Sequence, residues 1–324
     1  MIINISGMWN DAVCAHVSYI NDCMDSFIAE YQNEPKLSHS THGKKVWNFI
    51  TQHRNSIADP FQTDFSPLIT IFENEFPKNS NLRKKALTLF QSIFKYAKFA
   101  DRDTKGWSAY SLCKKMKWKV CPYCHVHSTR TAIPDKKEKR GFRPQLDHYY
   151  SQADYPFLAL SLGNLIPCCA QCNGPGFKHT KNFYVTPHPH PNTDAENIRF
   201  SLTAKDPKSK NDLVLEMLRE PEDEYEISLE SYSECEKTEN AISTFQLFER
   251  YQAHVAEAHR IARAVKEKSN EGASSRDQMC KQEDLPRKSS TILNFDPYDD
   301  DHYKCRTLGK MSRDIYFASL AKWP

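Results

Sequence analysis

The sequence predicts an α+β protein that is mostly helical, with a compact, turn-rich core near the middle of the chain. Three observations support this prediction. Residues 1–119 carry apolar side chains at helical spacing, residues 120–190 are rich in turns and contain two pairs of closely spaced cysteines, and residues 191–324 combine short strand patterns with a long helical one. We therefore expect a helical N-terminal region, a central core and a C-terminal region with these boundaries.

The clearest helical pattern of the N-terminal region lies between Asn79 and Phe99. Its apolar residues recur at steps of three and four and so share one helical face: Leu82, Ala86, Leu89, Phe90, Ile93, Phe94 and Ala97. Asn79 or Ser80 can cap the start of this helix. Weaker patterns of the same kind predict helices over residues 13–28, 44–57, 65–76 and 104–116.

The C-terminal region is expected to contain two strands and a long helix. Short apolar patterns predict strands over residues 198–202 and 225–229, and apolar spacing predicts a helix over residues 241–268. Residues 269–290 are polar and almost lack large apolar side chains, so we expect a flexible loop there. Residues 303–323 then predict a last helix.

Composition and charge narrow the class of protein. The mean hydropathy is -0.70, no apolar stretch is long enough to span a bilayer, and the first residues lack a signal-peptide pattern. We therefore expect a cytoplasmic protein with no membrane partner. The net charge is only +3, but residues 101–181 contain 14 Lys or Arg against 6 Asp or Glu. Such a basic segment indicates a polyanionic partner, with an ordinary solvated surface as the alternative.

Eleven cysteines in a chain of this kind argue against a disulfide framework and for a metal. Cys121 and Cys124 form one Cys-x-x-Cys pair, and Cys169 and Cys172 form a second. Two such turns supply the four thiolates of a closed, structural zinc site. Cys168 also has a workable spacing to the last cysteine, so the third ligand stays open, with Cys169 favoured by its spacing. The other candidate ligands are His125 and His127.

Four residues with useful chemistry lie between the cysteine pairs or directly after them. Asp147 supplies a hard oxygen ligand, and the adjacent His148 supplies a base that titrates near neutral pH. Asn164 precedes a short apolar run, and Asn173 directly follows the last cysteine. No single residue here is informative. The order of cysteine pair, Asp-His, Asn-Leu, cysteine pair, Asn and Lys is specific as a combination.

With this order the sequence resembles the HNH endonuclease family, the ββα-metal nucleases that carry zinc knuckles. The match spans residues 121–181 and rests on segments 121–124 (Cys-Pro-Tyr-Cys), 146–149 (Leu-Asp-His-Tyr), 164–167 (Asn-Leu-Ile-Pro) and 169–173 (Cys-Ala-Gln-Cys-Asn). It departs from the family pattern in two places. Asn173 stands where His is frequent, and residues 174–177 lengthen the interval before Lys178 by one residue. The resemblance implies a zinc-stabilised ββα-metal (HNH) core flanked by N- and C-terminal helices.

The resemblance also implies an activity, the metal-dependent hydrolysis of DNA phosphodiester bonds. His148 is then the general base that takes a proton from the attacking water. Asp147 and Asn173 are expected to hold one Mg²⁺ or Mn²⁺ ion at the scissile phosphate. Asn164 is expected to pin the loop that orients His148. Regular strand alternation points Asp147 and His148 to opposite faces, so both can serve one site only if the strand bends or ends there.

Basic residues on either side of the Asp-His segment are the candidates for contact with nucleic acid. They are Lys136, Lys137, Lys139, Arg140, Arg143, Lys178 and Lys181. Such cations neutralise phosphates, so we expect salt-dependent recognition of the backbone, with RNA as well as DNA left open. A solvated loop is the alternative interpretation of residues 136–140.

Two other functions fit the same residues. A zinc-knuckle module that binds nucleic acid without catalysis would share the cysteines, but it would not require Asp147, His148 and Asn173 together. A structural zinc protein that acts through protein contacts is the third hypothesis. The flanking helices, with residues 244–248 and 251–254, more weakly resemble the HNH nuclease subunit of Septu-type and retron-linked antiphage defence systems. That resemblance implies an antiviral role and an activating partner subunit such as an ATPase.

Overall fold

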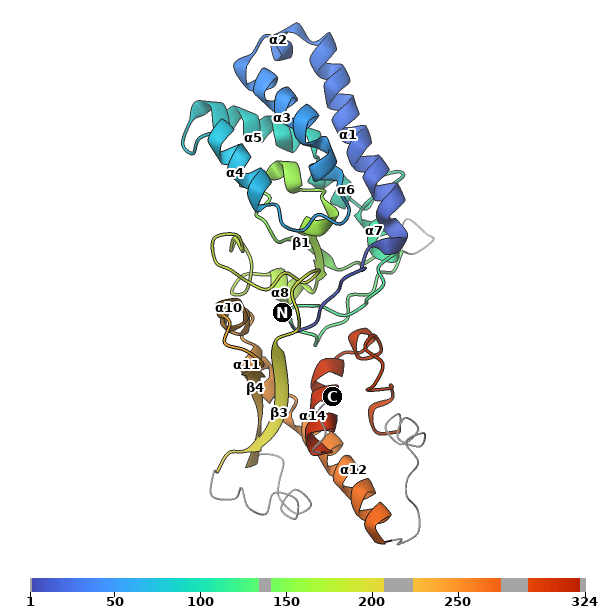
Figure 1. The fold of residues 1–324 in the computed structure, drawn as a ribbon. Helices are drawn as coiled ribbons and strands as arrows, with labels where there is room; N and C mark the ends of the chain where they lie inside the picture. The colour runs from blue at the N-terminus through green and yellow to red at the C-terminus, as the bar shows by residue number, and fades with distance from the viewer. Residues whose placement is uncertain (1, 134–140, 207–223, 275–290, 321–324) are drawn as a thin grey trace. The chain divides into compact units, whose positions relative to one another are not determined.

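The computed structural model of the chain is mostly helical and belongs to the α+β class (Figure 1). It describes residues 2–133, 141–206, 224–274 and 291–320. The chain divides into two compact units. The N-terminal unit contains residues 5–118 and 129–194, and the C-terminal unit contains residues 1–4, 119–128 and 195–324. No helix within the described ranges has both the length and the apolar character needed to cross a membrane.

Helices α1 to α7 all belong to the N-terminal unit. Their bounds are α1 Val13–Asn33, α2 Pro35–Ser38, α3 Thr41–Ala58, α4 Ser66–Glu75, α5 Asn81–Ile93, α6 Tyr96–Ala100 and α7 Ala109–Lys114. Ser80 caps α5, because its Oγ accepts the Arg83 N–H at 3.0 Å. The single helix predicted over residues 79–99 is wrong. Phe94 and Lys95 have non-helical backbone angles, and the break leaves Phe94 buried in the core.

Aromatic side chains fill the core of the N-terminal unit. The rings of Phe49, Phe72, Phe76, Phe90 and Phe157 are fully buried. Their centroids lie 4.8–6.1 Å apart, mostly in edge-to-face or tilted arrangements, which aromatic quadrupoles favour. Phe49 lies in α3, Phe72 and Phe76 lie in and at the end of α4, and Phe90 lies in α5. Phe157 instead belongs to the connection after β1. The aromatic core therefore anchors the loop next to the Asp-His segment.

The Asp-His segment lies on a short β-hairpin followed by one turn of helix. β1 (Gln145–His148) pairs antiparallel with β2 (Leu165–Cys168), and α8 (Ala170–Asn173) follows directly. The order strand, strand, helix is the order expected of a ββα core, although α8 is only a single turn. The connection between the strands contains the 3₁₀ turns Pro156–Leu158 and Leu162–Asn164.

Glycine is required where this connection approaches the segment after α3. A Cβ atom at Gly163 would overlap the backbone carbonyl oxygen of Gln62. The close approach brings the neighbouring Asn164 into the interior, where its side chain is fully buried.

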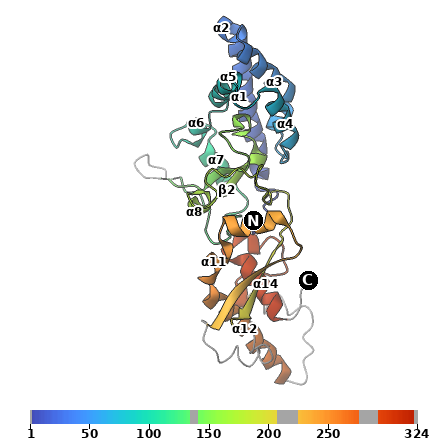
Figure 2. The same ribbon diagram turned by 90° about the vertical axis from the view of Figure 1, so that its left-hand side faces the viewer.

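The C-terminal unit is built on the second antiparallel sheet. β3 (Ile198–Ala204) pairs with β4 (Tyr225–Ser231), which confirms the two predicted strands and extends each by two residues. Helices α12 (Val255–Ser274) and α14 (Gly309–Ser319) pack against each other and against this sheet (Figure 2).

The single helix predicted over residues 241–268 is also wrong. The chain forms α10 (Glu236–Thr244), α11 (Leu247–Gln252) and then α12. The first break lies at Gln246, which has a left-handed φ of 47°. This turn lets Phe245 stack on Tyr123, with ring centroids 4.5 Å apart, while Leu247 stays buried. Tertiary burial of apolar side chains on both sides of the break thus overrides the helical pattern.

Two further expectations fall partly outside the described residues. The loop predicted over residues 269–290 is wrong for residues 269–274, which belong to α12, and residues 275–290 lie outside the described ranges. The last helix, predicted over residues 303–323, is shorter. A 3₁₀ turn at Tyr303–Cys305 precedes α14, and residues 321–324 again lie outside the described ranges.

We predict that Phe157→Ala lowers the free energy of unfolding by about 3–5 kcal/mol, because it opens a cavity in the aromatic core. Chemical denaturation monitored by circular dichroism measures this change. The matched control is Phe61→Ala, whose ring is 76% exposed and whose removal is expected to cost less than about 0.5 kcal/mol. Equal losses in the two variants would contradict the proposed anchoring role of Phe157.

Candidate functional site

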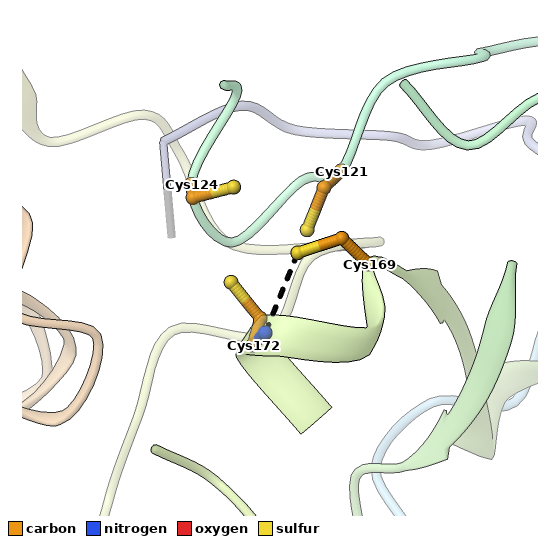
Figure 3. Close-up of side chains that lie close together, drawn as sticks. All are labelled: Cys121, Cys124, Cys169 and Cys172. Carbon is orange, nitrogen blue, oxygen red and sulfur yellow. Dashed lines mark hydrogen bonds between the residues drawn. The ribbon is translucent and has the colours of Figure 1, made fainter. Parts of the chain in front are cut away.

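Four cysteine side chains from two segments far apart in the sequence point toward one another (Figure 3). Their sulfur atoms all lie within 4.8 Å of one another, and all four residues are buried: Cys121, Cys124, Cys169 and Cys172. Zn–S bonds of about 2.3 Å place the sulfurs of a tetrahedral site about 3.8 Å apart, so the cluster needs little adjustment to close around an ion. The protein therefore contains a buried four-cysteine cluster that could hold a metal such as zinc.

Each cysteine pair lies in a turn whose backbone N–H groups point at carbonyl or sulfur atoms. The His125 N–H donates to the Cys121 carbonyl at 2.8 Å, and His125 closes the turn with a left-handed φ of 54°. Cys169 caps α8, because its Sγ accepts the Cys172 N–H at 3.3 Å, as the dashed line in Figure 3 shows. The Cys124 Sγ similarly lies 3.5 Å from the Val126 N. Such N–H donors stabilise the thiolate form that a metal requires.

The choice between Cys168 and Cys169 is made by the tertiary structure. Cys169 belongs to the cluster, whereas Cys168 ends β2 as a buried residue outside it. Burial, followed by the negative charge of Asp147, raises the pKa of the Cys168 thiol well above its usual range. Cys168 is therefore a neutral thiol in the interior.

The two histidines near the first pair have other neighbours. The Nδ1 of His125 accepts the Lys310 N–H at 3.2 Å. The Nδ1 of His127 lies 3.8 Å from the Cys124 Sγ and 3.4 Å from the Arg250 Nη2. Neither histidine belongs to the four-cysteine cluster.

Asp147 is buried beside a lysine. The Lys178 Nζ lies 2.8 Å from the Asp147 Oδ1, and each side chain is only 3% exposed. The same ammonium donates to the His148 carbonyl at 2.8 Å. Lys178 is therefore an internal counter-charge, which differs from the expected surface cation beside a cleft. The reason is the turn after α8, where the Lys178 N–H donates to the Cys172 carbonyl and the chain folds back under β1.

Asn173 contacts β1, the strand that carries Asp147. Its Nδ2 donates to the Gln145 Oε1 at 2.8 Å. Gln145 and Asp147 are two residues apart on one strand and so point to the same face. Because the Nδ2 makes this bond, the amide oxygen of Asn173 is available as a ligand. Asn173 thus contacts the neighbour of Asp147 on this face, at a position where Gln145 is exposed and Asp147 is buried.

His148 ends β1 and points to the other face. Its Nε2 lies 3.0 Å from the Ala159 carbonyl oxygen, and its ring meets the Tyr96 ring edge-on with centroids 4.5 Å apart. A carbonyl oxygen only accepts, so Nε2 carries the proton and Nδ1 keeps a free lone pair. Burial lowers the pKa of His148 to about 4, against the opposing effect of the Ala159 hydrogen bond. The imidazole is consequently neutral at pH 7.

Asn164 fixes the loop that contacts His148. Its Oδ1 accepts the Tyr150 N–H at 2.7 Å, and its Nδ2 donates to the carbonyls of Tyr150 and Leu158 at 3.2 and 3.0 Å. Leu158 directly precedes Ala159, the hydrogen-bond partner of His148. Asn164 thus ties the connection between β1 and β2 together by hydrogen bonds, and its role in orienting a general base stays a prediction.

The basic residues selected from the sequence have different surroundings. Arg143 is partly buried, and its Nη2 donates to the Ala100 carbonyl at 3.1 Å. Its guanidinium carbon lies 5.3 Å from the centre of the Tyr110 ring. With Lys178 also paired internally, these two residues do not have the free, exposed side chains expected of phosphate ligands. Lys181 is exposed. The remaining members lie outside the described residues: Lys136, Lys137, Lys139 and Arg140.

Sequence reasoning missed two residues that complete this site, Gln145 and Tyr96. Gln145 could have been found, because a period of two along a strand places it beside Asp147. Tyr96 gives no comparable signal. It lies in the short helix α6, and only the tertiary structure brings its hydroxyl to the Leu146 carbonyl at 3.2 Å and its ring to His148.

We predict that Cys169→Ala reduces the zinc content of purified protein from about one ion per chain to a small fraction of that, because three thiolates do not complete the tetrahedral site. Elemental analysis by mass spectrometry measures the content. Cys168→Ala is the matched control and should retain zinc, since that thiol lies outside the cluster. Equal zinc retention in both variants would show that the cluster is not the zinc site.

We predict that Asn164→Ala lowers the free energy of unfolding by about 2–4 kcal/mol, because it removes three hydrogen bonds in the interior and leaves backbone groups unpaired. Asn173→Ala removes one bond near the surface and should cost less than about 1 kcal/mol. Urea titration of the two variants provides the comparison. A smaller loss for Asn164→Ala than for Asn173→Ala would contradict the assigned role.

Comparison with other proteins adds no family assignment to this geometry. No protein-family model, no curated protein and no solved structure matches the chain. The resemblance to HNH nucleases accordingly rests on the residues themselves, namely the cysteine pairs, the Asp-His dipeptide and the two asparagines.

Proposed function

We propose that this protein is a metal-dependent endonuclease of the HNH type that hydrolyses DNA phosphodiester bonds. The main support is the state of His148. Its Nε2–H is committed to the Ala159 carbonyl, and burial keeps the ring neutral, so Nδ1 has the lone pair that a general base needs. The hairpin and α8 add the expected order of elements around it.

The side-chain oxygens of Asp147 and Asn173 are of the kind that a hard divalent cation prefers. Asp147 and Asn173 would hold Mg²⁺ or Mn²⁺ through one carboxylate and one amide oxygen, few enough ligands for the ion to keep water and take substrate phosphate as well. When bound, such an ion supplies positive charge at the scissile phosphate and the leaving oxygen. Lys178 already balances the charge of Asp147. A cation that binds Asp147 therefore approaches a carboxylate whose charge is already neutralised.

The residues around His148 would control the proton transfer. His148 takes a proton from water at Nδ1, and the Ala159 carbonyl then accepts a stronger hydrogen bond from the charged ring. Burial lowers the pKa of His148 more than the Ala159 hydrogen bond and the charge of Asp147 raise it, and an approaching phosphate adds negative charge that raises this pKa toward the range of an effective base. Asn164 and Tyr96 hold the loop and the ring in place.

The substrate and partner of this activity are proposals from the sequence. The exposed Lys181 is a candidate phosphate contact, together with the basic residues of the segment 136–140. DNA is the proposed substrate and RNA is the second one to test. The resemblance to antiphage nucleases adds an activating protein subunit, such as an ATPase, as a proposed partner.

A second candidate function is a zinc-knuckle module that binds nucleic acid without cutting it. The specific observation in its favour is the Lys178–Asp147 pair, which gives the carboxylate a structural partner. In that case Asp147 stabilises the fold, and the module needs no divalent cation besides zinc.

We predict that His148→Ala reduces cleavage of plasmid and single-stranded DNA at least about 100-fold, because general-base catalysis contributes a factor of this size or larger. The assay uses Mg²⁺ and Mn²⁺ in series, with and without EDTA, and gels quantify the products. His179→Ala is the matched control, since that histidine is exposed and close in sequence. Its activity should equal that of the unmodified chain.

Undiminished cleavage by His148→Ala would contradict the proposed base. Cleavage that continues in EDTA at the full rate would contradict the divalent cation. Nucleic-acid binding without cleavage, in the presence of candidate partner subunits and unchanged by His148→Ala, would favour the binding module.

A further inference from the structure

The lysine at the Asp147 site is not used by the proposed reaction. Its ammonium makes two charge-assisted contacts of 2.8 Å, one with the Asp147 carboxylate and one with the His148 carbonyl. It also lies 4.7 Å from the centre of the Phe183 ring. With Asp147 and Lys178 each 3% exposed, water screens this pair little. The ammonium therefore lies where Asp147 offers its strongest attraction to a cation.

A divalent cation and an ammonium compete for a single buried carboxylate. Two positive ions within a few ångströms repel strongly at the low dielectric constant of an interior, and one carboxylate offsets only one unit of charge. Asn173 contributes a neutral amide and adds no negative charge. A divalent cation can therefore bind Asp147 tightly only when the ammonium leaves.

The turn at Pro175 and Gly176, which precedes Lys178, has room to change its backbone conformation. Gly176 has a φ of 88°, and no atom lies within 4 Å of the position that a Cβ would take there. Glycine reaches many backbone conformations at low cost, so the turn before Lys178 can change without a steric clash at this residue. Pro175 and Gly176 are both exposed.

We infer that Lys178 is a built-in competitor of the divalent cation for Asp147, and that metal binding requires displacement of its ammonium. This inference rests on the proposed function in one respect, namely that Asp147 is the cation ligand. It assigns Lys178 a regulatory role in place of the direct phosphate contact expected from the sequence. The metal affinity of the chain is then set by the strength of the Lys178–Asp147 pair.

The first test measures Mn²⁺ binding by electron paramagnetic resonance in zinc-loaded protein, without nucleic acid. Lys178→Met is expected to bind Mn²⁺ at least tenfold more tightly than the unmodified chain. Lys181→Met, which removes an exposed lysine three residues away, should leave the affinity unchanged. Adding Asp147→Asn to Lys178→Met should abolish the gain, because it removes the carboxylate.

The second test uses the unmodified chain and does not depend on the folding of any variant. Acetic anhydride labels lysines according to their accessibility, and mass spectrometry quantifies each site. Lys178 is expected to react slowly without divalent cation and at least about five times faster with saturating Mg²⁺ or Mn²⁺. Lys181 serves as the internal reference and should react at the same rate in both conditions.

Equal Mn²⁺ affinity in the unmodified chain and Lys178→Met, including no binding to either, would overturn the inference. Unchanged protection of Lys178 at saturating cation would overturn it as well. The nuclease proposal is judged separately by cleavage. Tighter Mn²⁺ binding by Lys178→Met with no cleavage by any form would retain the competitor and reject the nuclease, and the reverse pattern would do the opposite.

Discussion

Buried negative charge in this protein has to be balanced by positive charge a few ångströms away. The Asp147–Lys178 pair meets that constraint, and the four-cysteine cluster could meet it by holding a metal ion. Four thiolates at a common point are stable only with a metal ion among them, whereas a single carboxylate is satisfied by one ammonium. Cys168, which lies near Asp147, meets the constraint differently and stays a neutral thiol. At Asp147 the folded chain therefore supplies the balancing charge itself.

The orientation of His148 depends on packing that begins far from it. Phe157 anchors the connection after β1 in the aromatic core, and Asn164 ties the same connection to Tyr150. Ala159 then presents its carbonyl to the His148 Nε2. A rigid core thus selects one tautomer of one imidazole, and this tautomer is what makes proton abstraction at Nδ1 a reasonable proposal.

Local sequence patterns predicted where helices and strands form better than they predicted where a helix breaks. The strands at β3 and β4 and the cap of α5 follow from alternation and capping chemistry. The breaks at Phe94 and Gln246 do not, because each is decided by burial of side chains that pack against distant segments. The surroundings of Lys178 were missed for the same reason, since a lysine after a glycine-rich turn looks like a surface cation in sequence.

The sequence by itself determined the chemistry that is available: two cysteine pairs, an Asp-His dipeptide and two asparagines in a specific order. Spacing within each pair is a local property, so it can be recognised without a fold. The tertiary structure decided that Cys169, rather than Cys168, joins the cluster, that the His148 ring meets Tyr96 and the Ala159 carbonyl, and that Lys178 neutralises Asp147. These outcomes depend on contacts between segments distant in sequence, whose energies no local pattern encodes.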